Sequence, residues 1–162
     1  MTGAEEELIA AARDAMKHAH APYSRFAVGA AVRLSGGAIV TGSNFENASY
    51  GLSLCAETVA LACANAQGRL SDVEAIATAG GLMAADGTIT GHDAVTPCGR
   101  CRQVLWEAEQ MAGRAISIYC GSAEGDHVEK HSLAELLPHA FGPASLGLGG
   151  RPREIETKAK DA

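Results

Sequence analysis

The sequence predicts an α/β protein, a sandwich in which helices cover a mixed five-stranded sheet. Amphipathic segments of helical period alternate with short apolar segments of strand length, an order typical of helices packed on a sheet. Hydrophobic residues make up 47% of the 162 residues but aromatic residues only 4%. We therefore expect alanine and glycine to carry much of the interior, with helices packed closely on a sheet of small residues. The length favours one domain whose core needs no disulfide.

Four helices are predicted. The first has an apolar face of Leu8, Ile9, Ala12, Ala15 and Met16, and Ala21-Pro22 ends it. A capping-box pattern, Ser132 followed by Glu135, begins the last. The expected ranges are 5–20, 55–67, 98–111 and a short helix after residue 132.

Five strands are predicted, over residues 26–34, 38–44, 73–79, 115–120 and 127–131. Ser35-Gly36-Gly37 joins the first two as a hairpin, and the third is a short apolar run with the length of a buried strand. Residues 80–96, rich in Gly, Asp and Thr, are expected to form a loop over the sheet. Residues 144–162 have the composition of a disordered tail, which leaves a domain over 1–143.

Charge and cysteine usage limit the classes of partner. A net charge of −6 argues against a nucleic-acid surface, which needs a basic stripe. The acidic N-terminus does not have the pattern of a signal peptide, and no apolar run is long enough to span a membrane. We therefore expect a cytoplasmic protein, in which five cysteines serve metal or redox chemistry rather than disulfides.

Two cysteine motifs dominate the functional prediction. Cys55-Ala56-Glu57 opens the second helix, and Pro97-Cys98-Gly99-Arg100-Cys101 opens the third. Three thiolates from two helix N-termini can hold three corners of a tetrahedral zinc site and leave the fourth for water, which is the pattern of a catalytic site. Zinc can lower the pKa of bound water towards ~7, and Glu57 is placed to accept and pass on the proton.

Three thiolates on Zn²⁺ carry a net charge of −1, so nearby positive charge is needed. Arg102, with Arg100 as the other candidate, and the two helix dipoles are expected to supply it. A structural zinc site is an alternative, but it would not require Glu57. A redox pair at Cys98 and Cys101 is another, and it leaves Cys55 and Glu57 unexplained. Cys63 and Cys120 are expected to be inert, buried packing residues.

The two motifs together resemble the zinc-deaminase signature, in its all-cysteine form. In this form they are similar to the small homotetrameric cytidine deaminases of the cytidine/deoxycytidylate deaminase superfamily. Three further segments resemble that family, at residues 23–31, 44–50 and 141–143. The resemblance implies a three-layer α/β/α sandwich, one zinc ion per subunit, shared active sites and a role in pyrimidine salvage. The implied reaction is hydrolytic deamination of cytidine and 2′-deoxycytidine.

The resemblance also implies roles for individual residues. An Asn and a Glu two apart at a strand end can face vicinal hydroxyls, and the family implies that Asn44 and Glu46 bind the ribose 3′-hydroxyl. Phe26 would flank the base, while the Ala56 backbone and Glu57 would hold the pyrimidine edge. A neighbouring subunit's site would be lined by Ala48, Tyr50 and Phe141.

One position departs from the family pattern, because Thr58 stands where an arginine usually follows the catalytic glutamate. Three other functions remain open at this point. A deaminase of a cytosine-nucleoside antibiotic such as blasticidin S would share the zinc motifs, but Asn44 and Glu46 favour a ribose. RNA or DNA editing conflicts with the net charge. A non-catalytic zinc-stabilised interaction domain would have no use for Glu57.

Overall fold

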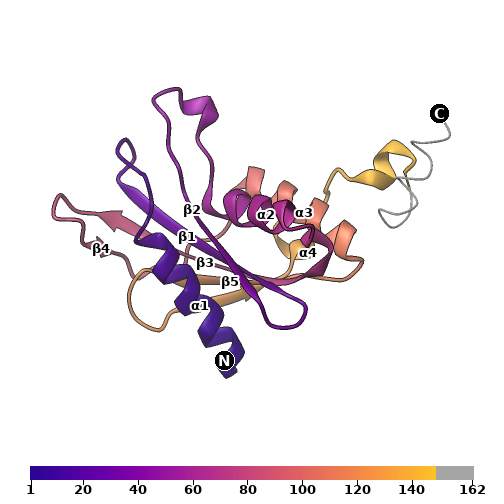
Figure 1. The fold of residues 1–162 in the computed structure, drawn as a ribbon, viewed down its shortest axis with the longest axis horizontal. Helices are drawn as coiled ribbons and strands as arrows, with labels where there is room; N and C mark the ends of the chain where they lie inside the picture. The colour runs from indigo at the N-terminus through magenta and orange to yellow at the C-terminus, as the bar shows by residue number, and fades with distance from the viewer. Residues whose placement is uncertain (149–162) are drawn as a thin grey trace.

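The computed structural model describes residues 1–148 and shows a twisted mixed sheet covered by helices on both faces (Figure 1). The strand order is β2-β1-β3-β5-β6, with β4 paired to the end of β3. Only β3 and β5 run parallel; the other pairs are antiparallel. The strands are β1 (Phe26–Leu34), β2 (Ile39–Ser43), β3 (Val73–Met83), β4 (Ile89–Thr90), β5 (Ser117–Ser122) and β6 (Val128–His131). The helices are α1 (Gly3–Met16), α2 (Ala56–Ala66), α3 (Gly99–Ala112) and α4 (Leu133–Leu136).

Strand alternation divides the interior into two cores. Ala30, Val32 and Leu34 of β1 belong to the core under α2, α3 and α4, whereas the intervening Ala31 faces α1. In β3, Ile76 faces the α2 side while Ala75, Ala77 and Ala79 face α1. The period of two in a strand thus produces the predicted α/β/α layers. It also gives α1 a sheet surface made largely of alanine.

Two glycines allow the helices to approach the sheet closely. A Cβ on Gly29 of β1 would lie 2.0 Å from the Ala12 carbonyl oxygen of α1. A Cβ on Gly42 of β2 would lie 2.5 Å from the Ala60 nitrogen of α2. No side chain fits at either position, so the expected close packing of helices on a small-residue sheet is confirmed.

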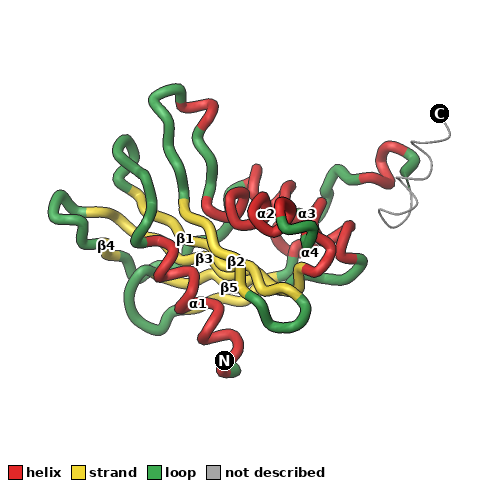
Figure 2. The backbone as a smooth tube through the Cα atoms, in the orientation of Figure 1, coloured by secondary structure: helices red, strands yellow, loops and turns green. Residues whose placement is uncertain are grey.

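The predicted helices and strands agree closely with the structure. The five apolar residues predicted for the buried face of the first helix are all buried, although α1 already ends at Met16. Ser132 and Glu135 form the capping box that begins α4. A long connection joins β2 to α2, green in Figure 2 except for a short 3₁₀ helix, η1 (Tyr50–Leu52), and a loop joins β4 to α3; most of the cavity residues described below lie in these two segments.

The expectation for residues 80–96 was partly wrong. β3 continues to Met83 and pairs with β4, so the sheet has six strands instead of five. Gly80 and Gly81 suggested a loop, yet both pair with β1 as part of β3, and glycine is needed there because neighbouring backbone atoms leave no room for a Cβ. A short 3₁₀ helix, η3 (Pro143–Leu146), occupies the start of the predicted tail. Residues 149–162 of that tail lie outside the described residues.

Candidate metal centre and active site

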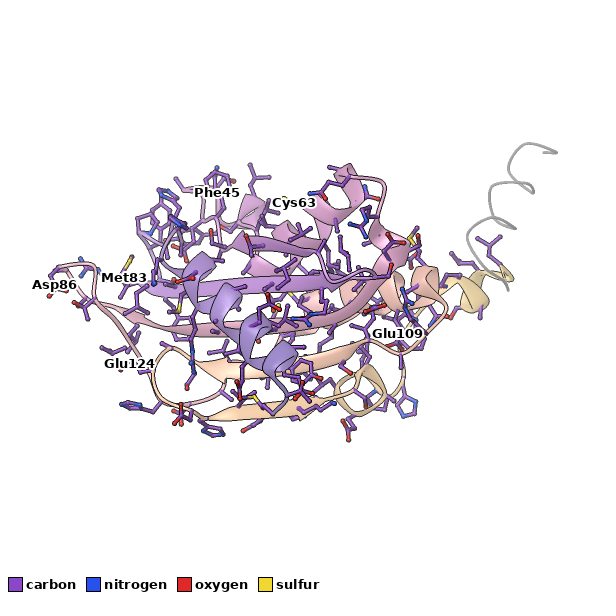
Figure 3. The ribbon with its side chains drawn as sticks, turned by 60° about the horizontal axis from the view of Figure 1, so that its bottom comes forward. Phe45, Cys63, Met83, Asp86, Glu109 and Glu124 are labelled. Atoms are coloured by element: carbon purple, nitrogen blue, oxygen red, sulfur yellow. The ribbon has the colours of Figure 1, made fainter. Side chains whose placement is uncertain are left out.

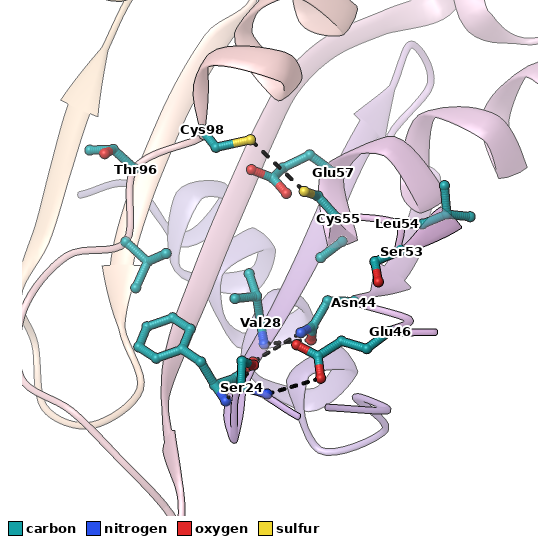
Figure 4. Close-up of a pocket in the computed structure, with 13 residues that line it drawn as sticks. Ser24, Val28, Asn44, Glu46, Ser53, Leu54, Cys55, Glu57, Thr96 and Cys98 are labelled. Carbon is teal, nitrogen blue, oxygen red and sulfur yellow. Dashed lines mark hydrogen bonds between the residues drawn. The ribbon is translucent and has the colours of Figure 1, made fainter. Parts of the chain in front are cut away.

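A cavity of about 340 Å³ opens at one end of the sheet (Figure 4), a volume within the range of small-molecule sites. Its walls come from four places in the fold: the start of β1, the segment after β2, the N-terminus of α2 and the loop before α3. The residues that argue for function are Phe26, Asn44, Glu46, Cys55, Ala56, Glu57 and Cys98.

The three predicted cysteine ligands converge at this cavity. Cys55 is the N-cap of α2, Cys98 is the N-cap of α3, and Cys101 follows in the first turn of α3. Their sulfur atoms all lie within 4.8 Å of one another, and the Cys55 and Cys98 sulfurs are 3.9 Å apart. Tetrahedral zinc with Zn–S bonds of about 2.3 Å separates two sulfurs by roughly 3.8 Å. The set therefore fits a zinc ion with little rearrangement.

The surroundings favour thiolates at this point. The Cys101 thiol stabilises the Cys55 thiolate, and together with Cys98 and the charge of Arg100 it lowers the pKa of Cys55 to about 6. Donation to Cys55 and burial raise the pKa of Cys101 in turn. Neither Cys55 nor Cys98 caps its helix with a side-chain hydrogen bond, so the first N–H groups of α2 and α3 remain available to negative charge.

Glu57 lies beside the sulfur cluster, in the first turn of α2 (Figure 4). Its side chain lines the cavity, and only 5% of the residue is exposed. Burial raises the pKa of this carboxyl group above its usual range. A buried carboxyl with a raised pKa, next to a metal position and open to a cavity, is suited to accept and donate protons near neutral pH.

Asn44 connects the end of β2 to the start of β1. Its Nδ2 donates to the Phe26 carbonyl oxygen and its Oδ1 accepts from the Val28 N–H, each at 2.9 Å. The side-chain amide thereby continues the strand pairing where the backbone of β2 turns away. One amide hydrogen and one carbonyl lone pair are still available to a ligand in the cavity.

Glu46 is held by the backbone of the segment before β1. Its Oε2 accepts from the Tyr23 N–H at 3.0 Å and the Ser24 N–H at 3.2 Å. Burial opposes ionisation, but hydrogen bonds from Ser24 and Tyr23 outweigh it and lower the pKa of Glu46. An ionised carboxylate therefore faces the cavity near Asn44 and can accept hydrogen bonds from hydroxyl groups.

Comparison with known proteins matches residues 2–116 to the family model for the zinc-binding region of cytidine and deoxycytidylate deaminases. The chain belongs to this deaminase family. A cytidine deaminase of Mycobacterium tuberculosis is 44% identical over 145 residues, covering 88% of this chain and 90% of the relative. One from Halalkalibacterium halodurans is 43% identical over 134 residues, covering 83% and 91%. The crystal structure of cytidine deaminase from Burkholderia pseudomallei superposes with a TM-score of 0.73 at 41% identity, covering 87% of this chain and all of that one.

The other residues singled out on the deaminase resemblance have different positions. Phe26 and Ala56 line the cavity, and their contacts with a substrate stay predictions. Ala48, Tyr50 and Phe141 do not line it, and all three are exposed, Tyr50 at 72% and Phe141 at 59%. Tyr50 lies in an adjoining hollow shared with Ser24 and Glu46. Their role in a neighbouring deaminase subunit stays a prediction.

The two arginines of the third helix differ in what they contact. Arg102, chosen as the charge-compensating residue, donates to the carbonyl oxygens of Pro97 and Leu136 at 2.7 and 2.9 Å. It thereby fixes the segment that leads into the deaminase cysteine motif. Arg100 donates to the Ser53 carbonyl oxygen, and its charge is the one that lowers the pKa of Cys55.

Sequence reasoning missed the residues that hold the far wall of the deaminase cavity. Val95 and Thr96 form this wall just before Cys98. The buried Thr78 of β3 donates to the Val95 carbonyl oxygen at 2.6 Å, and the Val95 N–H donates to Gly121 at 3.1 Å. These contacts join segments far apart in sequence, so no local pattern predicted them.

The expectation of a buried Cys63 was wrong, because it lies exposed on α2 (Figure 3), whereas Cys120 is buried.

Proposed function

We propose that the protein is a zinc-dependent enzyme that hydrolyses cytidine and 2′-deoxycytidine to uridine and 2′-deoxyuridine with release of ammonia. The observation that carries this proposal is the buried Glu57 carboxyl group beside three convergent thiols at the cavity wall. Family membership and the relatives named cytidine deaminase support it. The proposed setting is pyrimidine salvage in the cytoplasm. Within residues 1–148, the helices are too short or too polar to cross a membrane.

Cys55, Cys98 and Cys101 would hold one zinc ion per subunit. When bound, zinc lowers the pKa of a water molecule, so that a hydroxide nucleophile is available at neutral pH. Glu57 would take a proton from the attacking water and deliver it to N3 of the cytosine ring, which makes C4 electrophilic. After the resulting hydroxide adds at C4, Glu57 would move the proton of the new C4 hydroxyl to the exocyclic amine, so that the C4–N bond breaks, ammonia leaves and the C4 carbonyl of uridine forms. One water is consumed and one C–N bond is broken.

Charge in the cavity favours an unphosphorylated nucleoside. The ionised Glu46 and the neutral Asn44 suit the hydroxyls of a sugar, and Phe26 offers a face for the base. A phosphate on the 3′-hydroxyl of the sugar would be repelled by the Glu46 carboxylate. The net charge of −6 also disfavours nucleic acid as a substrate.

The direct test follows ultraviolet absorbance of purified, zinc-loaded protein with cytidine, 2′-deoxycytidine, blasticidin S and free cytosine. We expect loss of absorbance with the first two substrates and little with free cytosine, which lacks the sugar. Turnover of blasticidin S alone would identify the antibiotic as the substrate. No turnover of either nucleoside by protein with its full zinc content would refute the proposal.

The sugar contact can be tested with Glu46→Gln and a substrate lacking the 3′-hydroxyl. We expect this substitution to reduce kcat/KM for cytidine about 10–100-fold, because a hydrogen bond to a charged group contributes roughly 1.5–3 kcal/mol. With 3′-deoxycytidine the same substitution should have little effect. Steady-state kinetics on both proteins with both substrates gives the comparison. An equal loss with the two substrates would mean that Glu46 only supports the Tyr23–Ser24 backbone.

We also propose a homotetramer with shared active sites. The loop between β2 and α2 projects from the body of the fold (Figure 1) and exposes Phe45, Tyr50 and Leu52. Phe141 is exposed as well, and large apolar side chains gathered on a projecting loop are typical of a surface that another subunit covers. We expect sedimentation to give a mass about four times the 16.6 kDa of one chain. A fully active monomer would contradict the sharing of Tyr50 and Phe141 between subunits.

A further inference from the structure

Thr58 is the third residue of α2, follows Glu57 directly and is half-buried. A helical threonine commonly turns its hydroxyl to a backbone carbonyl of the preceding turn. In residues 1–148 the structure records no such bond for Thr58. Its Oγ1 lies instead 3.8 Å from the sulfur of Cys101. The hydroxyl is therefore available to one of the three metal-binding sulfurs.

Cys101 is the sulfur with the greatest need of a donor. Cys98 is exposed and Cys55 is partly exposed, so water can solvate both, whereas Cys101 has 0% exposure. A buried anion is stable only when hydrogen-bond donors or positive charges replace the lost water. The hydrogen bonds recorded for Arg100 and Arg102 all go to backbone carbonyl oxygens. Thr58 provides the one side-chain hydroxyl that contacts Cys101 in the described part of the chain.

We propose that the Thr58 hydroxyl donates a hydrogen bond to the zinc-bound thiolate of Cys101 and so supports the metal centre of this chain. The inference rests on the zinc site of the proposed function. Thr58 touches neither substrate nor metal, so it is a positioning residue that acts through Cys101. Loss of a partner of a metal ligand generally weakens metal binding about 10–100-fold.

The space around Thr58 leaves room for a larger side chain, which allows a second substitution to be tested. A cavity of about 180 Å³ lies beside it, lined by residues of α2 and α3 that include Glu107. A longer side chain at position 58 can extend there without displacing the core. Thr58→Arg would then add a guanidinium group, a stronger donor than a hydroxyl, on a stem long enough to turn back to Cys101 or to reach Glu107.

The experiment compares wild type with Thr58→Val, Thr58→Ser and Thr58→Arg as zinc-loaded proteins. Zinc affinity is measured by competition with a chromophoric chelator. Cobalt is then exchanged into each protein, and the sulfur-to-cobalt charge-transfer band reports on the thiolates directly. We expect Thr58→Val, which keeps the shape of the side chain but not the hydroxyl, to weaken zinc binding about tenfold and to move this band to longer wavelength. Thr58→Ser should match wild type, and Thr58→Arg should bind zinc at least as tightly as wild type.

Equal affinity and an unchanged cobalt band in Thr58→Val would overturn the inference while leaving the proposed function intact. If Thr58→Val does not fold, the comparison of Thr58→Ser and Thr58→Arg with wild type decides. Tenfold weaker zinc binding by Thr58→Ser, or weaker binding by Thr58→Arg, would then count against a hydrogen bond from position 58. Wild type that takes up neither zinc nor cobalt would refute the proposed function itself, and the inference with it.

Discussion

Glu57→Gln is expected to lower kcat for cytidine by about 10²–10⁴-fold, the range that a positioned general acid–base residue contributes. Glutamine keeps the shape of the buried side chain but cannot carry a proton between the attacking water, N3 and the leaving amine. Zinc should remain bound, because Cys55, Cys98 and Cys101 are untouched. The measurement is kcat from the ultraviolet assay, together with zinc content by atomic absorption on the same samples.

The exposed Glu6 of α1 supplies the matched control, since Glu6→Gln makes the same chemical change away from the cavity. This control should retain full turnover and full zinc content. Turnover of Glu57→Gln within threefold of wild type would remove Glu57 from proton transfer. Loss of zinc along with turnover would make Glu57 a support for the metal site instead.

Glu57→Gln is also expected to change the stability of the folded protein in a way that depends on pH. Burial raises the pKa of Glu57 in the folded protein above the ordinary value of 4.5, so the folded state binds this proton more tightly than the unfolded chain does. The contribution of Glu57 to stability is therefore fully present below pH 4.5 and is lost as the pH rises through its folded pKa. In chelator-treated protein, we expect Glu57→Gln to melt above wild type at pH 7 and at about the same temperature near pH 4. A difference that grows towards low pH would contradict the raised pKa.

Local patterns in the sequence predicted most of the fold because they depend on neighbouring residues. The apolar periodicity of residues 8–16 predicted the buried face of α1, and alternation predicted β1 with its observed bounds, Phe26–Leu34. The cysteine motifs predicted two helix N-termini, and Cys55 and Cys98 are indeed the N-cap residues of α2 and α3. What a helix start or a strand requires is encoded within a few residues, so these features are readable from sequence.

The features that were missed depend on contacts between distant segments. Gly80 and Gly81 suggest a turn by composition, yet they continue β3 by pairing with β1, and they are glycines because neighbouring backbones leave no room for side chains. Asn44 was expected to bind sugar, but its amide also joins β2 to β1 through Phe26 and Val28. Arg102 was expected to compensate the thiolate charge, which stays a prediction, and its hydrogen bonds to the carbonyl oxygens of Pro97 and Leu136 were not foreseen. In each case a tertiary partner decides the geometry, and sequence spacing alone does not name that partner.

Cys98→Ala should remove zinc and turnover together, and should also destabilise the fold. Three protein ligands define the site, and two sulfurs with a water hold zinc far more weakly. A metal that binds only the folded state stabilises it by about 4 kcal/mol when free zinc is roughly 1,000 times its Kd. For a chain of this size, that corresponds to a melting temperature lower by about 8–16 °C. Differential scanning calorimetry and zinc content on the purified variant check both effects.

Cys63→Ala is a close control for this change, because Cys63 and Cys98 are both exposed cysteines in the described residues but only Cys98 belongs to the sulfur cluster. The control should keep zinc, turnover and melting temperature. Chelator should lower the melting temperature of wild type and Cys63→Ala towards that of Cys98→Ala and leave Cys98→Ala unchanged. If chelator destabilises all three proteins equally, the stabilising metal lies elsewhere than at Cys98. Since both variants remove one exposed thiol, a difference between them reports on zinc coordination rather than on the loss of a sulfur atom.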